Sequence, residues 1–409
     1  MASFSIPLSG LTADAQDLSV ISNNLANLNT TGYKDQAVSF RDLYYQQLST
    51  NGSGNGIQVG SGTAIDAVES NFTGGTITST GVPTDAAISG NGFFVTQDGG
   101  AMQFTRDGNF AVSSTGELTT QDGAAVMGYQ ATNGIIGSQL TAIQIGDGMT
   151  SPAVATTSLQ LDANLSSAAN VGDSYSTPLT VYDSMGTAHM LDFQFTKTAT
   201  NTWGYQVTVP AADTGAATDT VVASGSMSFD GNGNLISPTS AVTGSISGLA
   251  DGASPMTFSW NLVDANGNPT VTQLSAASGT TSTSQNGYTS GTLTDYNINS
   301  TGVIEGSFSN GQTMALGQIA LANFSNEQGL QAVGDNSFQQ TLSSGAPAIG
   351  TAGSSGLGTL QGGSLESSNV DMATEFSNLI TAQRDYQASA KVVTTLDDIT
   401  QDLLNMKNT

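Results

Sequence analysis

Several residue types are missing or nearly missing from this sequence of 409 residues, and each absence excludes a class of chemistry. There is no cysteine, so the chain has no disulfide, no thiol nucleophile and no thiolate metal ligand. Histidine occurs only at position 189, so a metal site with several histidines is impossible, and a Ser-His-acid triad would have to use His189. Lysine and arginine together number 7 against 32 acidic residues, for a net charge of −25. Phosphate groups need a basic face, so this balance argues against nucleic acid and anionic membranes as partners.

Long apolar runs are absent as well. No stretch approaches the ~18 consecutive apolar residues of a membrane helix. The first residues, MASFSIPLSGL, have neither a basic region nor an unbroken apolar region, so they do not predict a cleavable Sec signal. Charged residues make up only 10% of the chain, against about 25% in an ordinary soluble protein. The remainder is rich in glycine and small uncharged polar residues, which is typical of an extracellular β protein. We expect no membrane insertion, and we expect any export to leave the N-terminus intact.

Catalytic and metal-binding motifs are also missing. The sequence contains no G-x-S-x-G elbow, no Walker A loop and no G-x-G-x-x-G fingerprint. His189 lies near a turn, and we interpret it as a surface or edge residue. Loops that begin at Asp230 and Asp264 share a D-x-N-x-N start with calcium loops but lack the sixth-position glycine and twelfth-position glutamate, so we predict plain turns. The sequence therefore predicts no catalytic residue, no metal and no cofactor, and we do not expect an enzyme.

What the sequence does contain is apolar periodicity at both ends. Near the N-terminus, apolar side chains recur at alternating steps of three and four, which predicts a helix from about Pro7 to Asn27 that is capped by Ser5. Residues 372–406 repeat the pattern. The stripe is as narrow as that of a coiled coil, so each helix must pair with the other helix or with copies of itself. We call this stripe the assembly seam and assign to it Leu8, Leu11, Leu18, Ile21, Leu25, Leu28, Phe376, Leu379, Tyr386, Val393, Leu396 and Leu403.

The middle of the chain alternates with period two. Turn signals such as Asn91-Gly92, Asp98-Gly99 and Asp107-Gly108 separate short β-branched and aromatic runs, which predicts antiparallel strands. The order of segments is symmetric about residues 148–285, so we predict discontinuous domains stacked outward. Their bounds are 1–33 and 365–409 for a helical inner-tube domain, 34–72 and 342–364 for irregular connectors, 73–147 and 286–341 for an inner β domain, and 148–285 for an outer β insert. The predicted fold is thus mainly β with terminal α-helices, which form a coiled-coil-like inner domain beside two antiparallel β domains.

Two long motifs bracket the chain. The N-terminal SGLTADAQDLSVISNNLANLNTTGYK and the C-terminal GGSLESSNVDMATEFSNLITAQRDYQASAK resemble the signatures of bacterial flagellar axial proteins, the family of rod, hook and hook-associated subunits. Between them, ISGNGFFV, FTRDGNF and LTVYDSMGTAHML resemble the hook branch of that family. Asparagine amides near a helix end can bond backbone groups, so we expect the N-terminal motif to form a junction. The family-motif residues are Asn23, Asn24, Asn27, Gly32, Tyr33, Asn369, Gln383, Arg384 and Tyr386.

The resemblance implies a structural subunit of an extracellular flagellar tube. In that family the end helices line an export channel, the β domains lie outside, and the curved, flexible tube passes motor torque to the filament. The implied partners are other copies of the chain, rod and hook-associated junction proteins, a hook cap during assembly and the flagellar type III export apparatus.

Three other functions stay open on the residues alone. A long distal rod protein of the same family would form straight rather than curved polymers. A secreted β-rich adhesin would have no need for helices at both ends. A secreted glycan-active enzyme would need a carboxylate pair that nothing in the sequence singles out.

Overall fold

The computed structural model describes residues 4–50, 56–146 and 148–407. The chain divides into two compact units, each described by itself. Unit 1 comprises Met1–Asp147, Tyr296–Gly306 and Ala315–Thr409. Unit 2 comprises Gly148–Asp295 and Ser307–Met314. The fold is mainly β with a helix at each end, as the sequence predicted.

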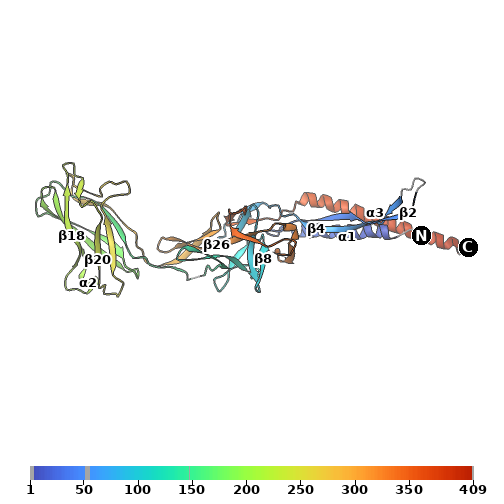
Figure 1. Ribbon diagram of the computed structural model, residues 1–409, viewed down its shortest axis with the longest axis horizontal. Helices are drawn as coiled ribbons and strands as arrows, with labels where there is room; N and C mark the ends of the chain where they lie inside the picture. Colours follow the sequence, from blue (N-terminus) through green and yellow to red (C-terminus); the bar gives the residue numbers. More distant parts are fainter. Residues whose placement is uncertain (1–3, 51–55, 147, 408–409) are drawn as a thin grey trace. The chain divides into compact units, whose positions relative to one another are not determined.

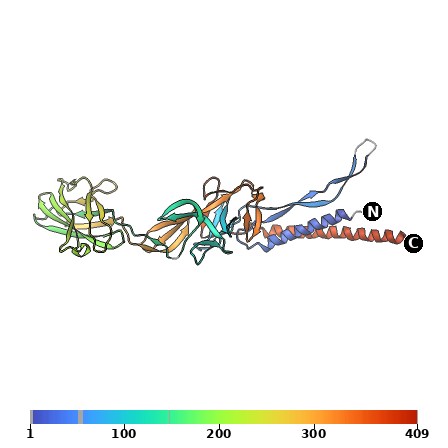
Figure 2. The same ribbon diagram turned by 60° about the horizontal axis from the view of Figure 1, so that its bottom comes forward.

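The two long helices belong to unit 1. Helix α1 runs from Ser5 to Ala26 and α3 from Met372 to Lys407. They pack side by side, and the two marked chain ends lie at the same end of the pair (Figures 1 and 2). Ser5 is the first residue of α1 rather than its cap, because the helix begins after Phe4, whose side chain makes no capping hydrogen bond. No helix in the described part of the chain is long and apolar enough to cross a membrane.

The segment after α1 is more regular than predicted. We expected an irregular connector at 34–72, but four strands form there, and β1 and β4 contact α1. Alternating apolar residues such as Val38 and Phe40 face Val68 and Ile65 across the β1–β4 pair, and this cross-strand packing outweighs the glycine content. These strands are β1 (Gln36–Asp42), β2 (Tyr45–Thr50), β3 (Gly56–Gly60) and β4 (Thr63–Ser70).

The rest of unit 1 is a β structure whose main path joins β26, β11, β7, β8, β28 and β27 in that order. Its core contains Phe93, Val95, Phe104 and Phe324, with aromatic rings in edge-to-face contact. The remaining elements of unit 1 are β5 (Ile77–Ser79), β6 (Ala86–Ser89), β7 (Phe93–Asp98), β8 (Ala101–Thr105), β9 (Phe110–Val112), β10 (Leu118–Thr120), β11 (Ala125–Thr132), β12 (Ile135–Ala142), η1 (Glu327–Gly329), β27 (Gln331–Gly334), β28 (Ser337–Gln339), β29 (Ala348–Thr351), β30 (Thr359–Gly362) and β31 (Ser364–Glu366). Three strands have residues in both units: β24 (Gly291–Ile298), β25 (Val303–Phe308) and β26 (Thr313–Asn323).

Unit 2 contains two five-stranded sheets, one in the order β15-β16-β17-β18-β19 and one with β20-β21-β14-β22 and β23 on β14. Strand alternation buries one face of each sheet around Trp203 and Trp260. The prediction of an antiparallel domain was wrong here, since β14 pairs in parallel with β21 and β22. Parallel strands need a long connection, and the whole first sheet lies between β14 and β21 in the sequence. The elements are β13 (Thr150–Ser151), β14 (Ser158–Asn164), β15 (Ser174–Tyr182), β16 (Ala188–Ala199), β17 (Thr202–Val209), α2 (Ala211–Thr214), β18 (Thr220–Phe229), β19 (Leu235–Ser237), β20 (Val242–Ile246), β21 (Met256–Asn261), β22 (Val271–Thr272) and β23 (Gly279–Gln285).

Candidate assembly surface and its buried junction

The residues of the assembly seam differ in how far the chain itself covers them. Ile21 is buried. Leu8, Phe376 and Tyr386 remain 53%, 50% and 37% exposed. The side chain of Leu403 lies outside the described part of the structure. The other seam residues are half-buried: Leu11, Leu18, Leu25, Leu28, Leu379, Val393 and Leu396.

The contact between the helices includes a polar pair that the seam did not predict, since Ser389 Oγ on α3 donates to Asp14 Oδ2 on α1 at 2.8 Å. The buried positions on α1 are Ala13, Val20, Ile21 and Asn24, and those on α3 include Ala382. Apart from Ile21, the larger apolar residues of the seam stay half-buried or exposed. The apolar stripe is therefore wider than one partner helix can cover.

Large apolar side chains consequently stay exposed along both helices. A helix face with this much uncovered apolar surface is typical of a protein–protein contact. The exposed residues of α3 and of the α1 region are Phe4, Ile6, Leu8, Met372, Phe376, Ile380, Tyr386, Val392, Ile399, Leu404 and Met406.

The asparagine-rich end of α1 forms a hydrogen-bonded turn into β1. The Asn24 amide is buried; it donates to the Gln36 carbonyl at 2.8 Å and accepts from the Gln36 backbone N–H at 3.0 Å. The Tyr33 hydroxyl donates to Asn24 at 3.2 Å and accepts from the Asn23 amide at 3.1 Å. Asn27 donates back to the Asn23 carbonyl at 2.9 Å. These hydrogen bonds join the end of α1 to the start of β1 across the reversal of the chain.

The same turn is joined to the segment that leads into α3. Gly32 N–H donates to the Glu366 carbonyl at 2.8 Å. The Asn369 side chain accepts from Asp35 N–H at 2.7 Å and donates to the Asn71 carbonyl at 2.8 Å. Residues from opposite ends of the sequence therefore hold each other in place at the point where α1 ends and α3 begins.

A fully buried ion-pair cluster lies beneath this turn. Glu366 Oε1 contacts Lys34 Nζ at 2.6 Å, and Oε2 contacts Arg106 Nη1 at 3.4 Å. The three side chains are at most 2% exposed. Burial lowers the pKa values of Lys34 and Arg106, and the negative charge of Glu366 opposes both shifts. Arg106 also donates to the Gly90 carbonyl and lies over the Phe93 ring.

Sequence reasoning missed this cluster as a site. Arg106 and Lys197 are the only bases between residues 42 and 383, and Arg106 interrupts an apolar, turn-rich stretch. A basic residue in such an apolar stretch was the one signal in the sequence that could have indicated a buried ion pair. Conversely, Gln383, Arg384 and Tyr386 do not join the junction; they are exposed on α3.

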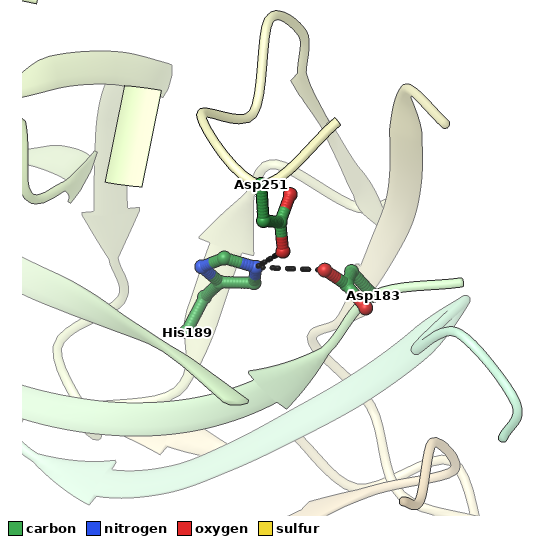
Figure 3. A group of neighbouring side chains, drawn as sticks. All are labelled: Asp183, His189 and Asp251. Atoms are coloured by element: carbon green, nitrogen blue, oxygen red, sulfur yellow. Dashed lines mark hydrogen bonds and ion pairs between the residues drawn. The ribbon is translucent and has the colours of Figure 1, made fainter. Parts of the chain in front are cut away.

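His189 is buried, which corrects its interpretation as a surface or edge residue. It is 4% exposed, on β16, and three carboxyl groups surround its ring. Nε2 lies 3.1 Å from Asp183 Oδ2 and 3.8 Å from Asp251 Oδ2 (Figure 3), and Nδ1 lies 3.1 Å from Asp213 Oδ2. The turn at 183–187, helix α2 and the loop before β21 supply these partners, so the ring ties three segments together. Among the described residues, Asp183, His189 and Asp251 form the group whose donor atoms, all within 4.8 Å of one another, are close enough to share a cation.

The pKa values of this cluster move in opposite directions. Burial disfavours the charged forms, but hydrogen bonds from His189 and from the Thr187 and Met185 amides leave the pKa of Asp183 at about 2. Burial also lowers the pKa of His189, but hydrogen bonds to Asp183 and Asp213 outweigh it and raise the pKa above the ordinary 6.5. The native state therefore favours an imidazolium among carboxylates.

This pair of shifts predicts how the stability of unit 2 depends on pH. The His189 contribution is present in full below pH 6.5 and is lost as pH rises through the raised pKa, whereas the Asp183 contribution is lost as pH falls below 3.8 toward 2. The chain has two tryptophans, Trp203 and Trp260, so fluorescence during urea unfolding of the full chain reports on unit 2. We expect its free energy of unfolding to fall above pH 6.5. The His189→Gln variant should lose that slope, and EDTA is included to remove any bound cation. A slope unchanged by His189→Gln would contradict the role of the imidazolium.

The two calcium-like loops are turns closed by their own carboxylates. Asp230 Oδ1 accepts from the Asn232 and Asn234 amides at 2.8 Å, and Asp264 accepts from Asn266 and Asn268 in the same way. These oxygens are already used by the backbone of the turn.

Four family models match the chain and together span most of it. "Flagella basal body rod protein" matches residues 6–34, and "Flagellar hook protein FlgE/F/G D1 domain" matches 87–158. "Flagellar basal body protein FlaE D2 domain" matches 155–288, and "Flagellar basal body rod FlgEFG protein C-terminal" matches 361–406.

Full-length relatives are similar throughout. The chain is 36% identical to the flagellar hook protein FlgE of Escherichia coli K12, over 99% of this chain and 100% of that one. It is 37% identical to the FlgE of Salmonella typhimurium LT2 over the same shares. The crystal structure of Helicobacter pylori flagellar hook protein FlgE2 aligns at a TM-score of 0.49 and 16% identity, over 69% of this chain and 99% of that one.

Proposed function

This chain belongs to the bacterial flagellar hook protein family and is a structural subunit of the hook that polymerises with itself, and on that premise we propose how its residues build the polymer. The assembly seam of each copy packs against seams of neighbouring copies to form the inner wall of a curved, flexible tube. That tube passes motor torque to the filament.

The observation that supports this proposal is the uncovered apolar surface of the two end helices. They already contact each other within one chain, yet Leu8, Phe376 and Ile380 stay about half exposed. Fully burying such a side chain contributes about 1.5–3 kcal/mol, and about half of that would come from neighbouring copies because half of each side chain is already covered. The buried ion-pair cluster of Lys34, Arg106 and Glu366 would hold both end helices at a fixed angle while neighbouring copies pack against them.

The domain arrangement expected from the sequence is part of the proposal. The helical inner domain, 1–33 and 365–409, would form the channel wall, and the β regions would face outward. Because basic residues are scarce in the β regions, few ion pairs would form between neighbouring copies there. Neighbouring copies could then slide past one another as the bent tube rotates.

The finer partners also belong to the proposal. They are the rod below, the junction proteins above, the hook cap and the flagellar type III export apparatus. The hook is part of the external flagellar structure, and export without a cleaved signal agrees with the N-terminal sequence. Similarity to structural proteins along the whole chain argues against the adhesin and the glycan-active enzyme.

Electron microscopy of the assembled protein separates the hook from the distal rod alternative. Purified protein would be concentrated in sucrose, which favours burial without adding salt. The proposal predicts hollow, curved tubes. Straight, rigid tubes would favour a rod protein, and failure of the intact chain to polymerise would contradict the proposal.

A single substitution tests the seam itself. Phe376→Ser removes a half-exposed aromatic side chain from α3, so the monomer should keep its fold while each subunit contact loses about 0.8–1.5 kcal/mol. The critical concentration for assembly, measured by sedimentation, should rise about 4- to 13-fold. Leu342→Ser is the control, because Leu342 is fully exposed but lies outside the end helices. Equal assembly of both variants would count against the seam.

A further inference from the structure

An acidic groove lies between α1, β1 and the first half of α3. It encloses about 420 Å³, and its lining includes four carboxyl groups but no basic side chain. Asp17 comes from α1, Asp35 from the turn before β1, and Glu375 and Asp385 from α3. In this partly buried groove the acids repel one another, and Lys34 behind the lining partly offsets the charge of Asp35.

Two oxygens in this groove lack partners. Glu375 is 8% exposed, and its Oε2 has no hydrogen-bond partner among the described residues. Asp35 Oδ1 is buried and unpartnered in the same way. Burial raises the pKa values of Asp17, Asp35 and Glu375; neighbouring acids add to the shift at Asp17 and Glu375, whereas asparagine hydrogen bonds and Lys34 oppose it at Asp35. A buried carboxylate oxygen without a donor is costly, so the groove has the chemistry of a site that awaits a cation.

The basic residues of the chain identify the cation. There are seven lysines and arginines, and those of unit 1 outside α3 are already paired: Lys34 and Arg106 with Glu366, and Arg41 with Asp66. In unit 2, Lys197 donates to the Ser167 carbonyl. The remaining three, Arg384, Lys391 and Lys407, all lie on α3. Arg384 and Lys391 are exposed and form no ion pair with any described residue.

Arg384 lies beside the groove of its own chain without entering it. Asp385 lines the groove, and successive residues of a helix are about 100° apart, so Arg384 occupies a different face of α3. A neighbouring copy can present the same arginine to this groove. A contact between two different patches is head-to-tail, and repeated head-to-tail contacts that do not close a ring build a helical polymer.

We propose that this groove binds the Arg384 guanidinium of a second copy of the chain. Arginine suits the site better than lysine because its planar fork can donate to Glu375 and Asp35 at once. The inference rests on the proposed self-assembly and assigns that assembly a polar contact beside the apolar seam, one that fixes which faces of the helices meet.

Charge reversal in the full-length chain tests the contact. Arg384→Glu should raise the critical concentration for assembly at least about tenfold, because it places a carboxylate against four others. Asp17→Lys should do the same from the groove side; Asp17 is only half-buried, so this change spares the buried Glu375. Lys391→Glu is the matched control, with the same charge change on the same exposed helix. Circular dichroism of each monomer checks that the fold is kept.

Combining the two charge reversals tests whether the two positions contact each other. The double variant Asp17→Lys/Arg384→Glu, and an equal mixture of the two single variants, should both recover part of the lost assembly, because the introduced lysine then faces the introduced glutamate while three acids remain in the groove. The inference is overturned if Arg384→Glu assembles like Lys391→Glu, or if neither the double variant nor the mixture recovers. Failure of the unmodified chain to assemble would instead contradict the proposed function.

Discussion

Replacing Glu366 with alanine is expected to cost unit 1 about 3–5 kcal/mol of stability, because it leaves two buried cations without their shared acid. Lys34 and Arg106 are at most 2% exposed, so water cannot replace the carboxylate. Gly75 N–H, which donates to Glu366 at 2.8 Å, would lose its acceptor as well. The loss should release the turn after α1 and the strand before α3 together.

Hydrogen exchange measured by mass spectrometry would detect this release. Peptides covering 30–36 and 364–370 should exchange faster in Glu366→Ala, while tryptophan fluorescence of unit 2 stays unchanged. Glu366→Gln keeps an acceptor oxygen but no charge, so it should lie between the alanine variant and the intact chain. Asp66→Ala is the control, because it breaks an exposed pair with Arg41 that contributes at most about 1 kcal/mol. Equal effects of Glu366→Ala and Asp66→Ala would show that the buried pair is dispensable.

The sequence predicted the elements that are set by local pattern. Period-two alternation around Phe93 and Phe104, cut by Asp-Gly and Asn-Gly turns, gave the strands of unit 1. Heptad-like spacing gave both end helices. Each signal is contained within about ten residues, so it can be found without knowing what lies nearby in space.

Contacts between distant residues could not be predicted in this way. Arg106 and Glu366 are 260 residues apart, and only the folded chain shows that they share one buried site. His189 is another case, since its carboxylate partners include residues in α2 and in the loop before β21. A lone polar residue beside a turn has no local pattern that separates an exposed position from a buried, paired one.

The helix contact lies between these two cases. Periodicity selected Ile21, which is buried, but the other buried apolar positions of α1 are Ala13 and Val20, whereas Leu11 and Leu18 are only half-buried. Hydrophobicity ranks leucine above alanine, whereas a close helix crossing favours the smaller side chain. The half-buried leucines beside these positions give the helices a second apolar surface.

Gly32→Ala is expected to cost about 2–5 kcal/mol, through two separate effects at one position. Gly32 has φ of +67°, a left-handed conformation that costs a non-glycine residue roughly 1–2 kcal/mol. A Cβ there would also lie 2.7 Å from the Arg106 carbonyl carbon and from the Asp107 nitrogen. Backbone atoms cannot rotate away as a side chain can, and relieving such a clash typically costs a further 1–3 kcal/mol or so.

Gly81→Ala separates these two effects. Gly81 has φ of +72°, but a Cβ there would meet no atom within 4 Å, so it incurs the conformational cost alone. The difference in unfolding free energy between the two variants, measured by calorimetry on the full chain, therefore reports the steric cost of separating α1 from Arg106. Gly32→Ala should also push the turn off the Glu366 carbonyl, so its assembly should weaken while that of Gly81→Ala does not. Equal stabilities would mean that the turn can move away from Arg106 freely, and the junction would then not hold the two end helices in place.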